Sequence, residues 1–307
     1  MTVEVKVLGP LVVTACGMSI VPSAPKQRQV LALLALNTGQ VVPMSALIEE
    51  IWGDQPPNAS IGTVQTYILH LRRKIGQALA RDGNRSSKEV LTTWPGGYTL
   101  DVPPQQVDAV QYEKLVAAGC RAIGRGDYAA AARTLDEALA LWRGKAFVDI
   151  AAGPQLRIER TRLEESRLCT LDLRIDADLR LGRHRLILDE LGGLCARHPW
   201  FENFHAQYML ALYRSGFQWR SLEVYRSLYT TVGQHLGIDP SRHLQELHRS
   251  ILADDPVIND PRFVISDLLY KSSAWPETKE RDPWARIRES TPRAHGSRQL
   301  GNSESPR

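Results

Sequence analysis

The chain has 307 residues, of which 43% are hydrophobic and 23% charged. This is enough for about two domains of ordinary size and excludes a disulfide-rich miniprotein or a wholly disordered chain. The longest apolar run, residues 30–36, is too short to cross a bilayer, and the N-terminal residues lack the basic flank and apolar core of an export signal. Composition therefore predicts an intracellular, cytoplasmic protein without membrane contact.

The net charge of +4 is small, but the basic residues are unevenly distributed. Between residues 70 and 88, six basic side chains stand against one acid, Asp82. A short basic stripe on a nearly neutral chain favours a polyanion over a membrane surface as its partner. A solvated helix face would explain the same charges, so charge by itself leaves both interpretations open.

The first hundred residues show the pattern of a small sheet, three helices and a hairpin. Val3, Val5 and Val7 alternate with polar residues as in a half-buried strand, and a second strand should follow at residues 11–14. Three helices are then expected, with Asn58 or Ser60 capping the third. This order is that of a winged helix-turn-helix, whose third helix enters the DNA major groove. The first expected helix covers residues 29–36, after a lead-in at residues 25–26, and the second covers 44–52. The third runs from its cap to about residue 79, and the hairpin strands are 90–93 and 98–102.

The third helix carries the residues best suited to contact DNA. If Val64, Ile68, Leu71 and Ile75 face the core, the opposite side points outward. Arginine can bind guanine with two hydrogen bonds, glutamine can do so with adenine, and threonine or leucine can touch a thymine methyl group. The candidates for base readout are Thr63, Gln65, Thr66, Leu69, His70 and Arg73. The candidates for phosphate contacts are Lys26, Arg28, Arg72, Lys74, Arg81, Arg85, Lys88 and Thr93.

The segment after residue 103 reads as a separate, all-helical region. Gly182 and Gly216 lie 34 residues apart, each between two helices, which is the helix-pair period of tetratricopeptide repeats. The join at residues 103–106 is short and rich in proline, so the helical region should pack against the winged helix. From Pro256 onward the composition is typical of a poorly ordered tail. The predicted helices cover residues 112–123, 128–142, 156–181, 185–198, 201–215, 219–236 and 241–252.

Three sequence runs, residues 47–57, 63–75 and 95–98, resemble the Streptomyces antibiotic regulatory protein family, and the resemblance extends over about residues 3–253. It implies an OmpR/PhoB-like winged helix at residues 1–103, a helical bacterial transcriptional activation domain at 104–255 and a tail at 256–307. The fold class expected is mainly α with a small β component. Trp94 departs from the pattern, because many relatives carry a basic residue there, which puts a direct minor-groove contact from this wing in doubt.

The same resemblance implies an activator of an antibiotic or secondary-metabolite gene cluster. Its partners would be double-stranded DNA with direct repeats near a promoter, a second copy as a homodimer or head-to-tail pair, and RNA polymerase holoenzyme with its sigma factor. The loop of Gly53, Asp54 and Gln55, followed by two prolines, is longer than a simple helix-turn-helix turn needs and should project from the DNA surface. In OmpR-like proteins this loop touches polymerase, so these three residues are candidates for that contact.

Enzyme motifs are missing from the sequence. It has no Walker loop, nucleophile elbow, His-Glu-x-x-His pair or Rossmann glycine pattern. The four cysteines include no Cys-x-x-Cys pair, so neither a zinc site nor a disulfide framework is expected. We therefore expect no catalytic activity, no cofactor and no metal. The alternative function is a helical-repeat module that senses a ligand or binds proteins, and acts as a repressor or scaffold.

Overall fold

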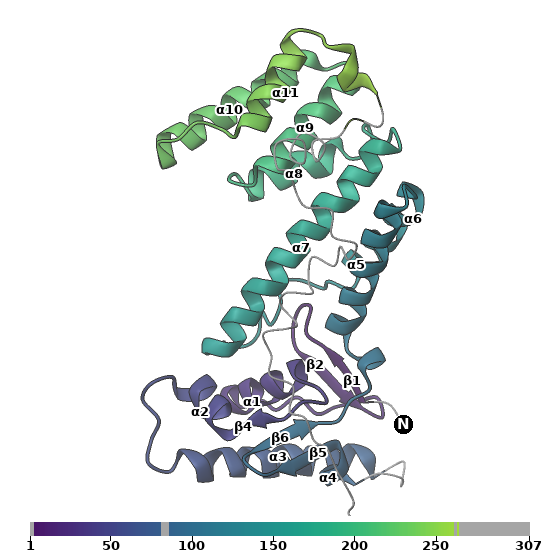
Figure 1. Cartoon of the computed structure of the whole chain (residues 1–307). Helices are drawn as coiled ribbons and strands as arrows, with labels where there is room; N and C mark the ends of the chain where they lie inside the picture. The colour runs from purple at the N-terminus through teal and green to yellow at the C-terminus, as the bar shows by residue number, and fades with distance from the viewer. Residues whose placement is uncertain (1–2, 81–85, 261–262, 264–307) are drawn as a thin grey trace, which may run out of the picture. The chain divides into compact units, whose positions relative to one another are not determined.

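The computed structural model describes residues 3–80, 86–260 and 263, all within one compact unit. The described chain is mainly helical with a small β component, as the sequence predicts (Figure 1). Arg81, Arg85 and most of the predicted tail lie outside the described residues.

The chain begins with an antiparallel sheet of three short strands. Strands β1 (Val3–Lys6), β2 (Val12–Ala15) and β3 (Met18–Ser19) pair in that order. Val3 and Val5 are buried while Glu4 and Lys6 are partly exposed, which confirms the predicted alternation. Strand β3 was not predicted, because two residues are too few to show a period.

The winged-helix part packs three helices against a second small sheet. Helix α1 (Pro25–Leu36) begins four residues before its predicted start, whereas α2 (Met44–Trp52) and α3 (Ser60–Leu79) lie where the second and third helices were expected. The sheet has the order β4 (Val42–Pro43), β6 (Gly97–Leu100) and β5 (Leu91–Trp94), with the short helix α4 (Ser87–Val90) before β5. A Cβ atom at Gly97 would lie 2.4 Å from the Val42 carbonyl oxygen, so only glycine lets β4 and β6 approach this closely.

The predicted cap of α3 is wrong. The residue before the helix is Ala59, which makes no side-chain capping bond, and Ser60 is already helical. Thr63 instead donates its hydroxyl to the Ala59 carbonyl oxygen at 3.0 Å. The capping role could not be assigned from composition, because the turn that precedes the helix decides which residue stands at its first position.

Seven helices follow the winged-helix part within the described chain, and each corresponds to a predicted one. Helices α5 and α6, α8 and α9, and α9 and α10 contact each other as neighbours. Gly126, Gly182 and Gly216 adopt φ angles of 74°, 71° and 87° at the turns between helices, which L side chains rarely adopt. The helices are α5 (Asp108–Gly124), α6 (Tyr128–Ala140), α7 (Pro154–Arg180), α8 (Leu188–Arg197), α9 (Glu202–Arg214), α10 (Gln218–Leu236) and α11 (Arg242–Leu252).

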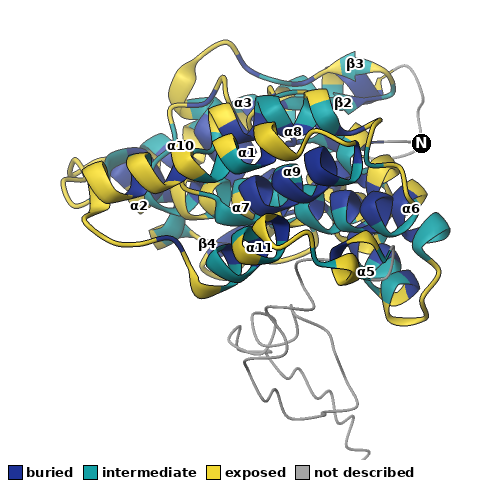
Figure 2. Cartoon of the chain, turned by 90° about the horizontal axis from the view of Figure 1, so that it is seen from above, coloured by how far each residue is buried: buried dark blue, intermediate teal, exposed yellow. Residues whose placement is uncertain are grey.

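The hydrophobic core does not divide at residue 103. One large cluster of buried residues runs from Val3 to Leu163 and unites the winged helix with α5 and the first half of α7. A second cluster runs from Ile175 to Ile258. Helix α7 contributes to both, and α9 is buried over most of its length while the outer side of α10 is exposed (Figure 2). The helical region therefore packs against the winged helix, as the short join predicts; the domain limits remain a prediction.

Two buried carboxylates join the winged-helix part to the helical region. Asp108, at the start of α5, accepts hydrogen bonds from the backbone N–H groups of Val7 at 2.8 Å and Leu8 at 3.0 Å. Glu50, in α2, accepts from the backbone N–H groups of Gly153, Gln155 and Leu156 at the N-terminus of α7. Burial raises the pKa of both carboxyl groups, whereas these N–H donors lower it. Each carboxylate thus satisfies backbone donors that would otherwise be buried without partners.

The ordered chain continues past the predicted start of the tail at Pro256. Residues Pro256–Asn259 form a 3₁₀ helix, η2, and Ile258 is only 1% exposed. Arg214 donates its Nε to the Ile258 carbonyl oxygen at 2.9 Å. An apolar side chain and a backbone carbonyl therefore attach residues 256–259 to the helical region, and the limit of the tail stays a prediction.

Between α7 and α9 lies a pair of carboxylates, Asp172 and Asp176. Gln207 donates its Nε2 to an oxygen of each, at 2.8 Å and 3.0 Å, and Asn203 donates to Asp172 at 3.2 Å. Burial, and then the charge of Asp176, raise the pKa of Asp172 to about 7. The folded chain therefore holds a proton at Asp172 over a pH range in which the unfolded chain does not.

Gly153→Ala should destabilise the contact between α2 and α7. Its Cβ atom would lie 1.9 Å from the Glu50 carbonyl oxygen, so the helix N-terminus would have to move away from the carboxylate. We expect a loss of about 2 to 3 kcal/mol in the free energy of unfolding, measured with urea. The control is Gly233→Ala in α10, where no atom lies within 4 Å. Equal stability of the two variants would contradict the close approach.

Asp172→Asn should change how stability depends on pH. Since the pKa of Asp172 rises on folding, from an ordinary 3.8 to about 7, wild-type stability falls as pH increases across that interval. Asparagine cannot ionise, so the variant does not lose this stability as pH rises. In urea unfolding, the stability of the variant relative to wild type should therefore be higher at about pH 8 than at about pH 5. Asp136→Asn, at an exposed position of α6, serves as control. A variant difference that is the same at both pH values would refute the assignment.

Candidate nucleic-acid interface

Helix α3 has the two faces that the sequence predicts. Val64, Ile68, Leu71 and Ile75 are at most 1% exposed and pack into the core. Gln65, Thr66, Leu69 and Arg73 are exposed, and Leu69 is 65% exposed. Thr63 and His70 are partly exposed at the edge of this face. The six candidates for base readout thus lie along the outward side of one helix.

The threonine hydroxyls of α3 are already used within the helix. Thr66 donates its Oγ1 hydrogen to the Gly62 carbonyl oxygen at 2.9 Å, and Thr63 does the same to Ala59. This leaves a methyl group and oxygen lone pairs for an outside partner, which suits contact with a thymine methyl. The His70 ring is positioned by α1, because its Nδ1 forms a hydrogen bond of 3.0 Å with Gln27 Nε2.

Arg72 ties α3 to the hairpin that forms the wing. Its guanidinium donates to the Leu91 carbonyl oxygen at 2.9 Å and 2.6 Å, and to Thr93 Oγ1 at 2.8 Å. Arg72 and Thr93 were predicted as phosphate contacts. The structure shows that they bind each other, so together they set the position of strand β5 relative to α3.

The remaining basic candidates differ in what they contact. Lys26 lies 5.0 Å above the Trp52 ring, in a cation–π contact. Arg28 donates to the Pro22 carbonyl oxygen and forms an ion pair with Asp149 at 3.3 Å, so it belongs to the contact between the winged helix and the helical region. Lys74 is half-buried and Lys88 is exposed. Arg81 and Arg85 lie in the segment that the structure does not describe.

The wing presents an aromatic residue at its tip. Trp94 is 52% exposed, and Gly96 adopts φ 83° in the turn that follows. Ile61, at the start of α3, is also apolar and 54% exposed. No sequence pattern marks Ile61 as a surface residue, because an isoleucine is more often buried.

The loop between α2 and α3 projects from the winged-helix part (Figure 1). Gly53 has φ 59°, and Asp54, Gln55 and the following residues through Ala59 are exposed. The exposure of Asp54 is therefore confirmed. Because its carboxylate and the Gln55 amide face solvent, this loop can offer polar groups to a partner without disturbing the core.

The described residues contain no group of three or more His, Cys, Asp or Glu side chains placed to hold a metal ion. Within the same residues, no helix combines the length and the apolar character needed to cross a membrane.

Comparison with protein families matches both parts of the chain. Residues 19–100 match the C-terminal domain of transcriptional regulatory proteins, and residues 107–252 match the bacterial transcriptional activator domain. An OmpR-type winged helix followed by an activator domain defines a transcriptional activator. The chain belongs to the Streptomyces antibiotic regulatory protein family.

The relatives and the solved structure that match this chain cover more than four fifths of it. Regulatory protein DnrI of Streptomyces peucetius is 48% identical over 256 residues, which cover 83% of this chain and 94% of DnrI. Regulatory protein AfsR of Streptomyces griseus is 33% identical over 83% of this chain and 25% of its own length. The solved structure of Mycobacterium tuberculosis EmbR in complex with a low affinity phosphopeptide has a TM-score of 0.78 and 30% identity, and covers 88% of this chain and 70% of that one.

Arg72→Met should loosen the wing. The variant keeps the aliphatic stem but loses three hydrogen bonds, so we expect a loss of about 1 to 2 kcal/mol in unfolding free energy and faster amide hydrogen exchange in β5. Arg73→Met changes the neighbouring, exposed arginine and is the matched control. If both variants exchange at the same rate in β5, Arg72 does not hold the wing.

Proposed function

We propose that this protein binds double-stranded DNA in a sequence-specific manner and activates transcription by recruiting RNA polymerase holoenzyme. The observation that carries the proposal is the outward face of α3, where six candidate side chains lie on one side of a helix while Arg72 holds the wing beside it. The target would be direct repeats at promoters of an antibiotic or secondary-metabolite gene cluster. Two copies would bind as a homodimer or head-to-tail pair, in the cytoplasm at the nucleoid, without enzymatic activity.

The division of roles on the DNA follows from exposure. Arg73 and Gln65 are exposed and would bind base edges, with Thr66 and Leu69 against thymine methyl groups. Thr63 and His70 stand at the edge of this face. Lys74 and Lys88 would bind phosphates together with Arg81 and Arg85, and Lys26 would do so from the first helix. We leave Arg28 out of this set because of its ion pair with Asp149.

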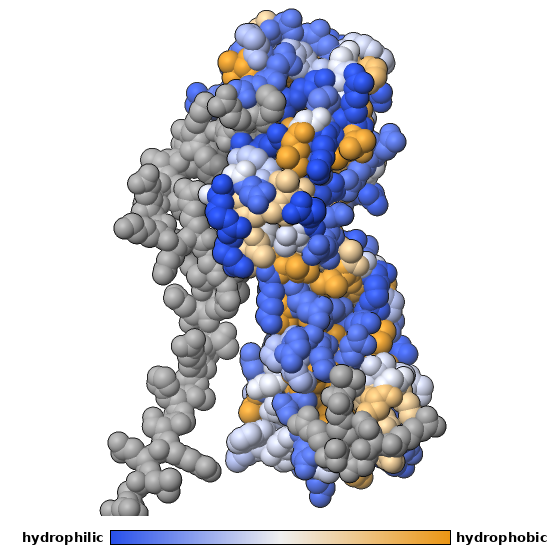
Figure 3. Space-filling model, turned by 90° about the vertical axis from the view of Figure 1, so that its right-hand side faces the viewer, coloured by the Kyte–Doolittle hydropathy of each residue, from blue (hydrophilic) through white to orange (hydrophobic). Residues whose placement is uncertain are grey.

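The helical region would contact proteins rather than DNA. Residues 104–255 contain as many acidic as basic side chains, so this region has little electrostatic attraction to phosphates. Large apolar side chains are exposed there, including Trp200, Trp219 and Tyr229. On the face shown in Figure 3, apolar residues form small groups separated by hydrophilic ones, rather than one continuous patch. Such mixed surfaces are typical of transient protein contacts.

The direct test is a footprint of the full chain on the promoters that neighbour its own gene, followed by transcription in a purified system. Protection of repeated sites and increased transcript would support the proposal. Absence of duplex binding at moderate salt would overturn it. Binding without activation would favour the alternative, in which the helical region senses a ligand or acts as a scaffold and the protein represses.

Arg73→Ala and Lys88→Ala should affect DNA binding in different ways. Loss of a bidentate contact to guanine at Arg73 should cost about 1 to 3 kcal/mol for the specific site and little for random duplex. Loss of a phosphate contact at Lys88 should weaken both alike and reduce the slope of log K against log salt by about one. Arg125→Ala, at an exposed position after α5, is the control for charge. Identical specificity ratios in all three variants would remove Arg73 from base readout.

Asp54→Ala combined with Gln55→Ala should separate binding from activation. Both side chains are exposed in the loop that leads to α3, so their removal should leave the fold and the DNA affinity unchanged. We expect activated transcription in the purified system to fall several-fold. A parallel loss of DNA affinity would show that the loop supports the duplex contact instead.

A further inference from the structure

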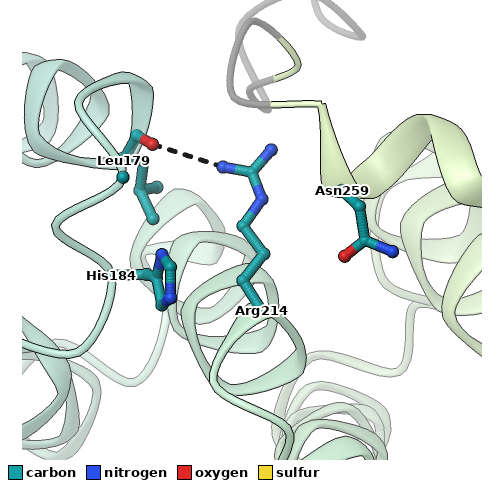
Figure 4. A pocket seen from close by; sticks show the side chains of 5 residues that line it. Leu179, His184, Arg214 and Asn259 are labelled. Carbon is teal, nitrogen blue, oxygen red and sulfur yellow. Dashed lines mark hydrogen bonds between the residues drawn. The ribbon is translucent and has the colours of Figure 1, made fainter.

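A small pocket lies at the C-terminal end of α7 (Figure 4). Leu179 and Gly182 line it from the end of α7 and the following turn, His184 from the same turn, Arg214 from the last residue of α9, and Asn259 from η2. Its volume is about 120 Å³. That is room for a few water molecules or one small ion, and well below the several hundred Å³ that cofactors and drug-sized ligands need.

Arg214 brings a largely buried positive charge to this pocket. Its Nε and Nη2 donate to the carbonyl oxygens of Ile258, Asp260 and Phe263 at 2.6 to 2.9 Å. Its Nη1 makes only a long bond, 3.4 Å, to the Leu179 carbonyl oxygen, so a donor remains on the side of the pocket. Burial lowers the pKa of Arg214 to about 10; the charge of Asp260 opposes this and that of Arg180 adds to it.

His184 faces the same hollow with an unused polar atom. Its Nδ1 is buried and has no hydrogen-bond partner among the described residues. Burial, and then the positive charges of Arg214 and Arg185, lower the pKa of the ring. A buried nitrogen without a partner costs free energy unless something in the pocket binds it.

The balance of charge around the pocket is positive. Arg180, Arg185 and Arg214 are close enough for their charges to act on the pocket's ionisable groups. Asp178, one residue before Leu179, is already paired with Arg174 and Arg183, each at 3.1 Å. Backbone carbonyls orient the Arg214 guanidinium without bringing a full charge, and Asp260 brings one negative charge that acts on it, against three arginines. A small hollow with several cations and unused donors is complementary to an anion.

We propose that this pocket binds a small oxyanion, with Arg214 Nη1, His184 and the Asn259 amide as donors. The bound anion connects η2 to the ends of α7 and α9, and thereby stabilises the C-terminal end of the helical region. The site is independent of the proposed DNA-binding function, because its residues belong to neither α3 nor the wing.

The experiment uses the full chain with inorganic phosphate as the probe, because phosphate is a tetrahedral oxyanion that the pocket can hold. Line broadening of the ³¹P NMR signal reports binding directly. Thermal unfolding in sodium phosphate and in sodium chloride of equal ionic strength gives a second reading. Since phosphate stabilises proteins in general by exclusion from their surface, only a saturable shift counts as binding.

Substitutions locate the site. His184→Phe fills the hollow and removes a donor, and Asn259→Leu removes the amide; each should weaken phosphate affinity about tenfold while leaving the Arg214 contacts to the η2 segment in place. Arg242→Gln is the matched control, since it removes one positive charge at a position of α11 where the side chain is 82% exposed. The urea midpoint of each variant establishes that it is folded.

The outcomes are exclusive. Saturable binding that His184→Phe and Asn259→Leu weaken and Arg242→Gln does not would establish the site. Binding that all three variants weaken equally, or no saturable binding at all, would overturn it. O-phosphoserine as a second probe distinguishes the source of the anion: if it binds at least as tightly as phosphate, the pocket accepts a phosphoryl group on a larger molecule, and if it does not bind, the pocket takes the free ion.

Discussion

The arrangement of the described chain depends on two buried carboxylates, each of which lies in one part of the chain and accepts hydrogen bonds from the backbone of the other part. Glu50 extends from the winged helix to the N-terminus of α7, and Asp108 extends from the helical region to the end of β1. Each lies in a place where burial penalises its charge, and each is held there by backbone N–H groups. Removal of either partner would leave buried donors or a buried charge unsatisfied, so the two parts cannot separate without a large cost.

This junction determines how the proposed DNA contact relates to the helical region. Glu50 stands near the end of α2, and the loop that leads to α3 begins three residues later at Gly53. Helix α2 is therefore attached to α7 at the same end from which the exposed loop leaves it. Arg28, which belongs to α1, adds an ion pair to Asp149 on the same side. Winged helix and activator domain form one folded structure with a continuous core, in which α3 is carried at a defined position.

Helix α7 connects the core of the winged helix to the core of the last four helices. Its first half belongs to the core shared with the winged helix, and its second half to the core of α8 to α11. Between them, Ser166 and Thr170 bind the hydroxyl of Tyr112 in α5, at 3.1 Å and 2.7 Å. A helix anchored at both halves and in its middle acts as a rigid connection. The pocket proposed to bind an anion lies at its C-terminal end, where η2 packs beside it.

Sequence patterns determined the helices, the first two strands, the buried and exposed faces of α3, and the exposed loop at Asp54, because these follow from local periodicity and turn residues. They did not predict β3, β4 or α4, which are too short to show a period. Nor did they determine which basic residues bind within the protein and which face solvent. Three arginines of the winged helix have three different roles. Arg28, in α1, forms an ion pair with Asp149. In α3, Arg72 holds the wing whereas its neighbour Arg73 faces outward. Only the tertiary structure decided this, because the partners are carbonyls and carboxylates distant in sequence whose positions no local pattern encodes.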